Sequence, residues 1–231
     1  MVVFIIIGYV TVGLRFATIT ALLLAFIGAT GMWMHSMITL SSVLVSVLIC
    51  FVIGVPLGVL ASYNKWYRDI QNVVLDAMQT LPYFCYLIPV LMFFGGNIVS
   101  AVIATVIYSV PPIIRLTALG LSQVSGGYSE VSKSFGGTGI QTLNKVKFPL
   151  AVPSLVMGFN QTVIMAFAMQ IVTPLIGGKG LGLQVFNALQ RSDTGRGLSA
   201  GLAIVLLAII IDRITHAWTK KQRQALGLDQ S

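Results

Sequence analysis

The chain has 231 residues, of which 56% are hydrophobic and only 9% carry a charge. This composition excludes an ordinary soluble domain, in which about a quarter of the residues are charged. The formal net charge is +8, but the basic residues stand at the ends of apolar runs. They are typical of membrane flanks and do not indicate a nucleic-acid partner. We therefore expect an all-α membrane protein, a polytopic helical bundle in a lipid bilayer.

Residues 1–14 carry no charge and would span only about 21 Å as a helix, less than the roughly 30 Å hydrocarbon core. No basic residue precedes this apolar run, so we interpret it as part of a membrane helix and not as a signal peptide. The next charged residue after Arg15 is Lys65, which leaves room for spans near residues 16–33 and 38–62. We expect residues 33–36 to form the turn between them.

Glycine and proline interrupt several of the apolar runs. Gly54, Pro56 and Gly58 predict a bend or a close helix contact. The charge-free stretch between Asp76 and Arg115 has room for two spans, broken at residues 95–97. Further prolines in this region are Pro82, Pro89, Pro111 and Pro112. In lipid such breaks persist where neighbouring helices or a cavity satisfy the freed backbone groups, which is typical of transporters.

Two more spans are expected near residues 152–174 and 197–218, which gives about six full spans. If the loop at 120–150 is cytoplasmic, eleven of the fourteen basic residues lie on the cytoplasmic side or at the inner ends of spans. The other three are Lys179, Arg191 and Arg196. This asymmetry is what the positive-inside rule predicts, and it also makes 219–231 a basic cytoplasmic tail.

The long polar stretch from Glu130 to Pro149 separates two of the expected spans. Ser129 can cap a short helix, with Glu130 in its first turn. Gly136 and its neighbouring glycines predict a reversal after that helix. A second short amphipathic helix follows, which we expect Pro149 to end. Two short helices folded together on one membrane face predict a docking surface for a soluble partner.

The same stretch resembles the EAA loop of inner-membrane permeases from binding-protein-dependent ABC importers, whose pattern is E-A-A-x3-G-x9-I-x-L-P. Glu130-Val131-Ser132 occupy the E-A-A positions, Gly136 the glycine, and Val146-Lys147-Phe148-Pro149 the last four positions. The spacing is kept, although both alanines, the isoleucine and the leucine are replaced. The resemblance implies that the residues contacting the ATPase are Glu130, Val131, Ser132, Lys133, Phe135, Gly136, Gly139 and Pro149.

Other segments resemble the permeases of glycine betaine/proline betaine importers: Leu75–Gly95, Pro111–Val124, Phe159–Thr162 and Gly197–Thr215. The resemblance implies the type I ABC importer permease fold, with a core at 36–218 and a coupling loop at 125–150. It leaves 1–35 as N-terminal membrane helices outside that core. Members of this family usually have more chain before the first span, so a shortened N-terminus is expected here.

The resemblance also implies an assembly in the bacterial inner membrane: two permease subunits, here a homodimer, two ATPases and an extracytoplasmic substrate-binding protein. The chain has no G-x-x-x-x-G-K-[ST] phosphate loop; the glycine-rich run at 177–182 has glycine after its lysine. We therefore expect ATP and magnesium on the partner ATPase and no cofactor, metal or catalytic residue on this chain. Asp76 and Asp212 are expected in salt bridges or caps, and Cys50 and Cys85 as small core residues.

Candidate residues for the substrate path are aromatic and amide side chains within the spans: Tyr83, Phe84, Tyr86, Asn160 and Gln161. Aromatic faces attract quaternary ammonium groups, and amides at membrane depth seek a polar partner. The alternative is that the aromatics pack helices and the amides bond between helices. Two functional alternatives also stay open. One is a permease of this fold for trimethylamine N-oxide, choline, carnitine or an amino acid, and the other is an ion-coupled carrier or channel.

Overall fold

The computed structural model describes residues 5–6, 8–9, 13–124 and 126–225, and these residues contain helices and no strand. The helices longer than one turn are α2 (Leu14–Ala29), α3 (Trp33–Tyr63), α4 (Lys65–Thr80), α5 (Phe84–Phe94), α6 (Ile98–Ser109), α7 (Pro111–Gln123), α8 (Gly126–Ser134), α10 (Phe148–Met169), α11 (Leu181–Arg191) and α12 (Thr194–Ala225). Short turns are α9 (Gly139–Thr142), η1 (Leu143–Lys147) and η2 (Thr173–Ile176). The predicted all-α membrane bundle is confirmed.

Four helices of the described part are long and apolar enough to cross a membrane: Trp33–Tyr63, Ile98–Gln123, Gly139–Met169 and Thr194–Ala217. α4 and α5 together make a fifth candidate, although they meet at an angle of 97°. α2 is shorter, with 16 residues. The structure thus has four or five long spans beside one shorter apolar helix, where the sequence predicted about six. Much of the 1–14 segment lies outside the described residues.

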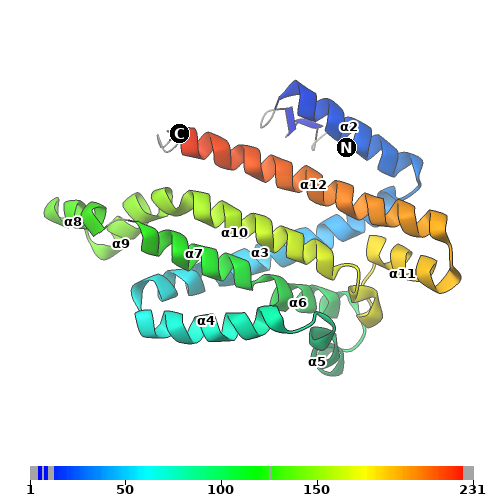
Figure 1. Ribbon diagram of the computed structural model, residues 1–231, viewed down its shortest axis with the longest axis horizontal. Helices are drawn as coiled ribbons and strands as arrows, with labels where there is room; N and C mark the ends of the chain where they lie inside the picture. The colour runs from blue at the N-terminus through cyan, green and yellow to red at the C-terminus, as the bar shows by residue number, and fades with distance from the viewer. Residues whose placement is uncertain (1–4, 7, 10–12, 125, 226–231) are drawn as a thin grey trace.

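The bundle is elongated, and its two ends differ (Figure 1). α8 and α9 form one end, toward which the α3–α4 junction and the last residues of α12 also lie. α5 and α11 lie toward the opposite end. α12 is one continuous helix to Ala225, so the first residues of the predicted tail at 219–231 belong to it. Residues 226–231 lie outside the described part.

α3 and α7 pack closely because glycines of α3 lie against side chains of α7. A Cβ atom on Gly54 would lie 2.4 Å from Cγ2 of Ile113. A Cβ atom on Gly58 would lie 2.6 Å from Cβ of Thr117. Because Gly54 and Gly58 have no side chains, α3 and α7 can approach closely, as the sequence predicted. α3 continues through Pro56.

The sharp bend between α4 and α5 occurs at Pro82. Leu81, the residue before it, is extended with φ −67° and ψ 130°. Proline disfavours helical geometry in the preceding residue and cannot donate a backbone hydrogen bond, so α4 ends there. Pro111 and Pro112 act differently, because they lie in the first turn of α7, where proline is tolerated. α6 and α7 consequently form one 26-residue span.

One predicted boundary shifts and one is confirmed. The turn before α3 lies at Thr30–Met32, with φ +71° at Gly31, so residues 33–36 begin α3 and do not form the turn. The predicted break at 95–97 is confirmed: α5 ends at Phe94, and the Asn97 side chain accepts a hydrogen bond from the Ser100 backbone N–H at 3.0 Å. Cys50 is buried, as predicted, but Cys85 is exposed.

Candidate functional site

The segment predicted to dock a partner is a compact projection made of α8, α9, the turn between them and η1, which we call the knob (residues 126–147). α8 begins at Gly126, so Glu130 lies in the middle of the helix, and the prediction that Ser129 caps it is wrong. Gly136 has φ +75°, a conformation that favours glycine, and α8 ends before it, as the sequence predicted.

A small network of hydrogen bonds holds the two helices of the knob together. The Ser132 and Thr142 hydroxyls lie 2.8 Å apart, and the Thr142 hydroxyl donates to the Thr138 carbonyl at 3.0 Å. The Gly137 backbone N–H donates to the Ser132 carbonyl at 2.9 Å. Thr138 and Gln141 form a capping box at the start of α9. Ser132 is therefore turned inward and fixes the shape of the knob.

Pro149 does not end the second short helix, contrary to the prediction. The helix continues from Gly139 to Met169, because the π-turn η1 widens the backbone just before the proline. There the Phe148 backbone N–H bonds to the carbonyl of Leu143, five residues back. Pro149 lies in the first turn of α10. Since the π-turn shifts the hydrogen-bond register, the proline is accommodated without a break.

Large apolar side chains of the knob are exposed. They are Tyr128, Val131, Phe135 and Ile140. Phe135, which follows α8 directly, is 89% exposed. A cluster of such side chains on a segment that links two spans marks a surface for protein contact. The predicted coupling residues thus divide: Val131 and Phe135 are exposed, whereas Ser132 supports the knob from inside.

The aromatic candidates of the substrate path gather around Tyr108 of α6. The ring centre of Tyr108 lies 6.2 Å from that of Tyr83 and 6.0 Å from that of Tyr86. The Tyr83 and Phe84 rings are 4.9 Å apart. The Tyr86 hydroxyl donates to the Met78 carbonyl at the end of α4. Tyr83, Tyr86 and Tyr108 therefore form a tyrosine cluster where α4, α5 and α6 meet.

The amide candidates do not join the tyrosine cluster. Asn160 of α10 is buried, and its Oδ1 atom has no hydrogen-bond partner in the described part of the chain. Gln161, the next residue along α10, is exposed on another side of the helix. Successive residues of a helix point about 100° apart, so one contact surface cannot use both side chains equally. A role for these amides in the substrate path stays a prediction.

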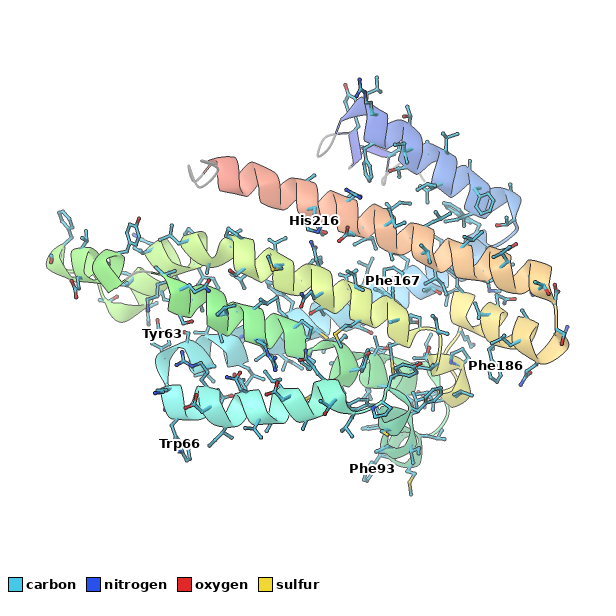
Figure 2. All side chains as sticks on the ribbon, viewed as in Figure 1. Tyr63, Trp66, Phe93, Phe167, Phe186 and His216 are labelled. Carbon is cyan, nitrogen blue, oxygen red and sulfur yellow. The ribbon has the colours of Figure 1, made fainter. Side chains whose placement is uncertain are left out.

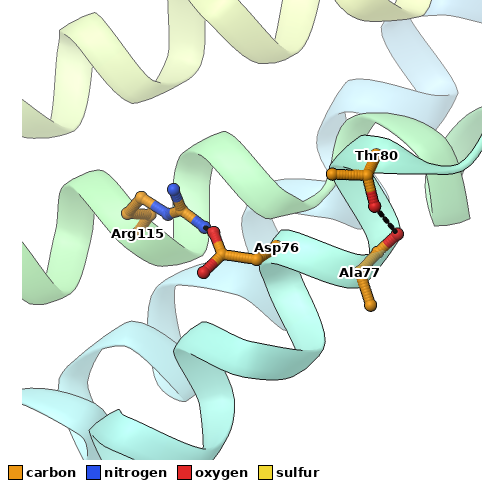
Figure 3. A network of polar contacts seen from close by, with 4 residues as sticks. All are labelled: Asp76, Ala77, Thr80 and Arg115. Atoms are coloured by element: carbon orange, nitrogen blue, oxygen red, sulfur yellow. Dashed lines mark hydrogen bonds and ion pairs between the residues drawn. The ribbon is translucent and has the colours of Figure 1, made fainter.

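A polar cavity of about 440 Å³ lies between α4 and α7. Within it Arg115 donates from Nη2 to Oδ1 of Asp76 at 2.6 Å (Figure 3). The predicted salt bridge of Asp76 is confirmed. Oδ1 of Asp212 lies 3.3 Å from Nε2 of His216, a contact that is an ion pair only when the imidazole is protonated. The sequence placed Arg115 at the inner end of a span, but it lies eight residues before the end of α7.

A larger and almost entirely apolar groove lies among α3, α10 and α12. It is lined by residues that include Leu48, Phe51, Phe159 and Ile214. Phe167, another aromatic of α10, lies deeper in the core among these helices (Figure 2). In the part of the chain that the structure describes, no group of three or more histidine, cysteine, aspartate or glutamate side chains could hold a metal ion.

Several apolar helices long enough to cross a membrane, with breaks at prolines and a folded knob at one end, are typical of a polytopic membrane transport protein. The chain belongs to the family described as binding-protein-dependent transport system inner membrane component, whose model matches residues 54–224. The family predicted from the spacing of residues 130–149 is therefore confirmed, and the protein is a multi-pass component of the inner membrane.

Several relatives are permeases named for glycine betaine. The chain is 42% identical to the glycine betaine/proline betaine transport system permease protein ProW of Escherichia coli, over 96% of this chain and 63% of ProW. It is 45% identical to the glycine betaine/carnitine transport permease protein GbuB of Listeria monocytogenes, over 83% of this chain and 68% of GbuB. The chain thus spans less than two thirds of the length of ProW.

The fold also matches a solved structure with a TM-score of 0.72. That structure is an inward-facing conformation of the MetNI methionine ABC transporter, and the match covers 80% of this chain and 93% of the other. The two sequences are 23% identical, so the likeness concerns the fold alone. It confirms the predicted ABC importer permease fold. The individual coupling and substrate-path residues stay predictions.

Proposed function

We propose that the chain is the permease subunit of an ATP-driven importer for glycine betaine, proline betaine and related methylated amines. Two copies of the chain form the translocation path, and two separate ATPase subunits bind ATP and magnesium. An extracytoplasmic binding protein delivers the solute. The substrate class is supported by the names of the relatives, four of which are 42–45% identical to this chain and named for glycine betaine.

The knob is the observation that carries this proposal. Its backbone is ordered by the Ser132–Thr142 contact and by the capping box, yet it exposes Val131, Phe135 and Ile140. A monomer gains nothing from exposing these side chains at the end of a bundle, whereas a soluble partner can bury them. An ATPase docked there can act on the membrane helices, since the knob is joined to α7 and α10.

A cytoplasmic knob and C-terminus agree with the distribution of positive charge. Lys145 and Lys147 lie in the π-turn, and Lys65 begins α4 at the same end of the bundle. The Lys147 ammonium lies 5.1 Å from the centre of the Tyr63 ring, a cation–π contact near that membrane face. Basic residues concentrate on the cytoplasmic side of inner-membrane proteins, which supports this orientation.

The tyrosine cluster suits a quaternary ammonium solute. Tyr83 is 43% exposed, so part of its ring remains available beside Tyr86 and Tyr108. A methylated ammonium group is attracted to the faces of such rings, because these faces carry a partial negative charge. The group forms no strong hydrogen bond, so the rings do not have to supply a partner for one. These rings therefore offer a passing contact to the head group and no tight binding site.

Uptake by proteoliposomes tests the proposal. The vesicles contain this chain with its ATPase and its binding protein, and labelled solute is offered with and without internal ATP. We expect ATP-dependent uptake of glycine betaine and no uptake without ATP. Trimethylamine N-oxide is a required second solute, because a permease named for it in Ruegeria pomeroyi is 36% identical to this chain. Uptake of methionine alone would reject the substrate class, and uptake independent of ATP would reject the importer.

A further inference from the structure

The polar cavity between α4 and α7 is lined by stripes from both helices. Arg68, Asn72 and Asp76 are spaced four residues apart and share one face of α4. On α7, Arg115 and Ser122 are seven residues apart and line the opposite wall. α4 thus turns a row of polar side chains toward α7, whose wall holds Ala118 and Leu119 between Arg115 and Ser122. The two walls include both members of the Asp76–Arg115 ion pair.

This ion pair lies far from the knob ends of its two helices and one turn from their other ends. Asp76 is eleven residues from Lys65, and Arg115 is eight residues from Gln123, where α4 and α7 reach the knob end of the bundle. At about 1.5 Å per residue, the two side chains begin about 16 Å and 12 Å along their helices. The pair therefore lies two to three helical turns from the knob end of the bundle.

The pair is also open to its surroundings. The Asp76 side chain is 63% exposed and that of Arg115 is 38% exposed. Ionised side chains on the helices of a membrane bundle avoid lipid and face a water-filled cavity or the interior of an assembly. The Nε atom of Arg115 is buried and has no hydrogen-bond partner in the described part of the chain. The guanidinium therefore keeps bonding capacity that Asp76 does not use.

Aromatic rings lie near the outer end of α4. The Met78 carbonyl, two residues beyond Asp76, accepts the hydrogen bond of the Tyr86 hydroxyl. Tyr86 in turn contacts Tyr108, which contacts Tyr83. α4 thus runs from a ring cluster that suits a methylated ammonium to a guanidinium that suits a carboxylate. A betaine carries both of these groups, separated by a few bonds.

We propose that the Asp76–Arg115 pair is a transit site for zwitterionic solute, an inference that rests on the proposed function. The solute carboxylate takes the place of Asp76 on the Arg115 guanidinium, and the solute ammonium takes the place of Arg115 beside the Asp76 carboxylate. The exchange conserves charge on both partners, because a zwitterion offers one group of each sign. The two protein side chains pair again when the solute leaves, so neither charge is left unpaired.

The first test compares uptake with ATP hydrolysis in proteoliposomes containing the complete transporter. Arg115→Gln and Asp76→Asn keep polar side chains of similar size but remove the charges. Because a hydrogen bond to a charged group is lost, we expect the maximal rate of glycine betaine uptake to fall roughly ten- to a hundredfold. The KM and the ATP hydrolysis stimulated by the loaded binding protein should remain near the wild-type values, since neither is set at this site.

Three results separate the possibilities. Parallel loss of uptake and of ATP hydrolysis would show that the pair only holds α4 to α7, and unchanged uptake would show that the pair has no role. Either would overturn the inference. If the wild-type complex itself failed to import glycine betaine, the proposed function would fail first.

A labelling experiment tests the site without relying on transport rates. Asp76→Cys is placed in a chain with Cys50→Ala and Cys85→Ala, and it is treated with trimethylammonium-ethyl methanethiosulfonate, a water-soluble thiol reagent. Val74→Cys is the matched control, because Val74 is also exposed but lies on another face of α4. We expect rapid labelling at position 76, slowed by excess glycine betaine, and slow labelling at position 74. No labelling at position 76, or labelling that glycine betaine does not slow, would refute the site.

Discussion

Replacement of Phe135 by alanine should weaken attachment of the ATPase more than any other single truncation on the knob. Phe135 is 89% exposed, and an aromatic side chain presents about 200 Å² in total, so about 180 Å² is available for a partner to cover. At about 25 cal/mol per Å², full burial corresponds to roughly 4.5 kcal/mol. Alanine retains part of this area. We therefore expect a loss of about 2–4 kcal/mol, or about 30- to 1,000-fold in affinity.

The assay is titration of the purified ATPase onto the permease in nanodiscs, followed by ATP-driven uptake in proteoliposomes. Phe93→Ala is the control, because Phe93 is 83% exposed on α5, toward the opposite end of the bundle (Figure 2). The Phe93→Ala permease should bind the ATPase normally. Equal binding of Phe135→Ala and wild type would refute the docking role of the knob, and so would an equal loss in Phe93→Ala.

The other predictions concern the knob and the contact between α3 and α7. Gly136→Pro should abolish ATP-driven uptake while the chain still inserts, because proline cannot adopt the φ of +75° found there; normal uptake would contradict this reasoning. Glu130→Lys reverses the charge on an exposed part of α8 and should release the ATPase in the same titration; retained binding would remove Glu130 from the interface. Gly58→Ala should cost about 1–3 kcal/mol in an unfolding titration, because its Cβ would lie 2.6 Å from Thr117, whereas Gly201→Ala, with open space around it, should be neutral or stabilising.

The sequence predicts the helical class and the position of the knob well because both depend on local signals. Apolar runs between charges identify the spans, and the glycines around Gly136 stop α8 wherever the rest of the chain lies. Boundary errors arise where two local signals compete. Ser129 is a good cap by composition, but α8 begins three residues earlier at Gly126. A proline usually ends a helix, yet the π-turn before Pro149 lets the helix continue.

Contacts between distant helices could not be predicted in the same way. Asp76 and Arg115 are 39 residues apart, and nothing in the sequence indicates which faces of α4 and α7 meet. The same holds for Tyr108, which completes the tyrosine cluster from a different helix than Tyr83 and Tyr86. The inward orientation of Ser132 depends on Thr142, which approaches only after the chain reverses at the glycines. Packing between elements decides each of these cases.

The knob is connected to the Asp76–Arg115 pair through α7 and α10, which have little freedom to move separately. α7 leads into α8, while α9 continues through the π-turn into α10. α7 and α10 also pack closely: a Cβ on Gly120 would lie 2.6 Å from Cβ of Ser154, and one on Gly158 would lie 3.3 Å from Cα of Ile113. A displacement of the knob by an ATPase must therefore move α7 and α10 together. Arg115 lies on α7 and Asp76 on α4, so any movement of α7 relative to α4 changes the separation of the pair. The Asp76–Arg115 site would thus open and close when the ATPase moves α7 against α4.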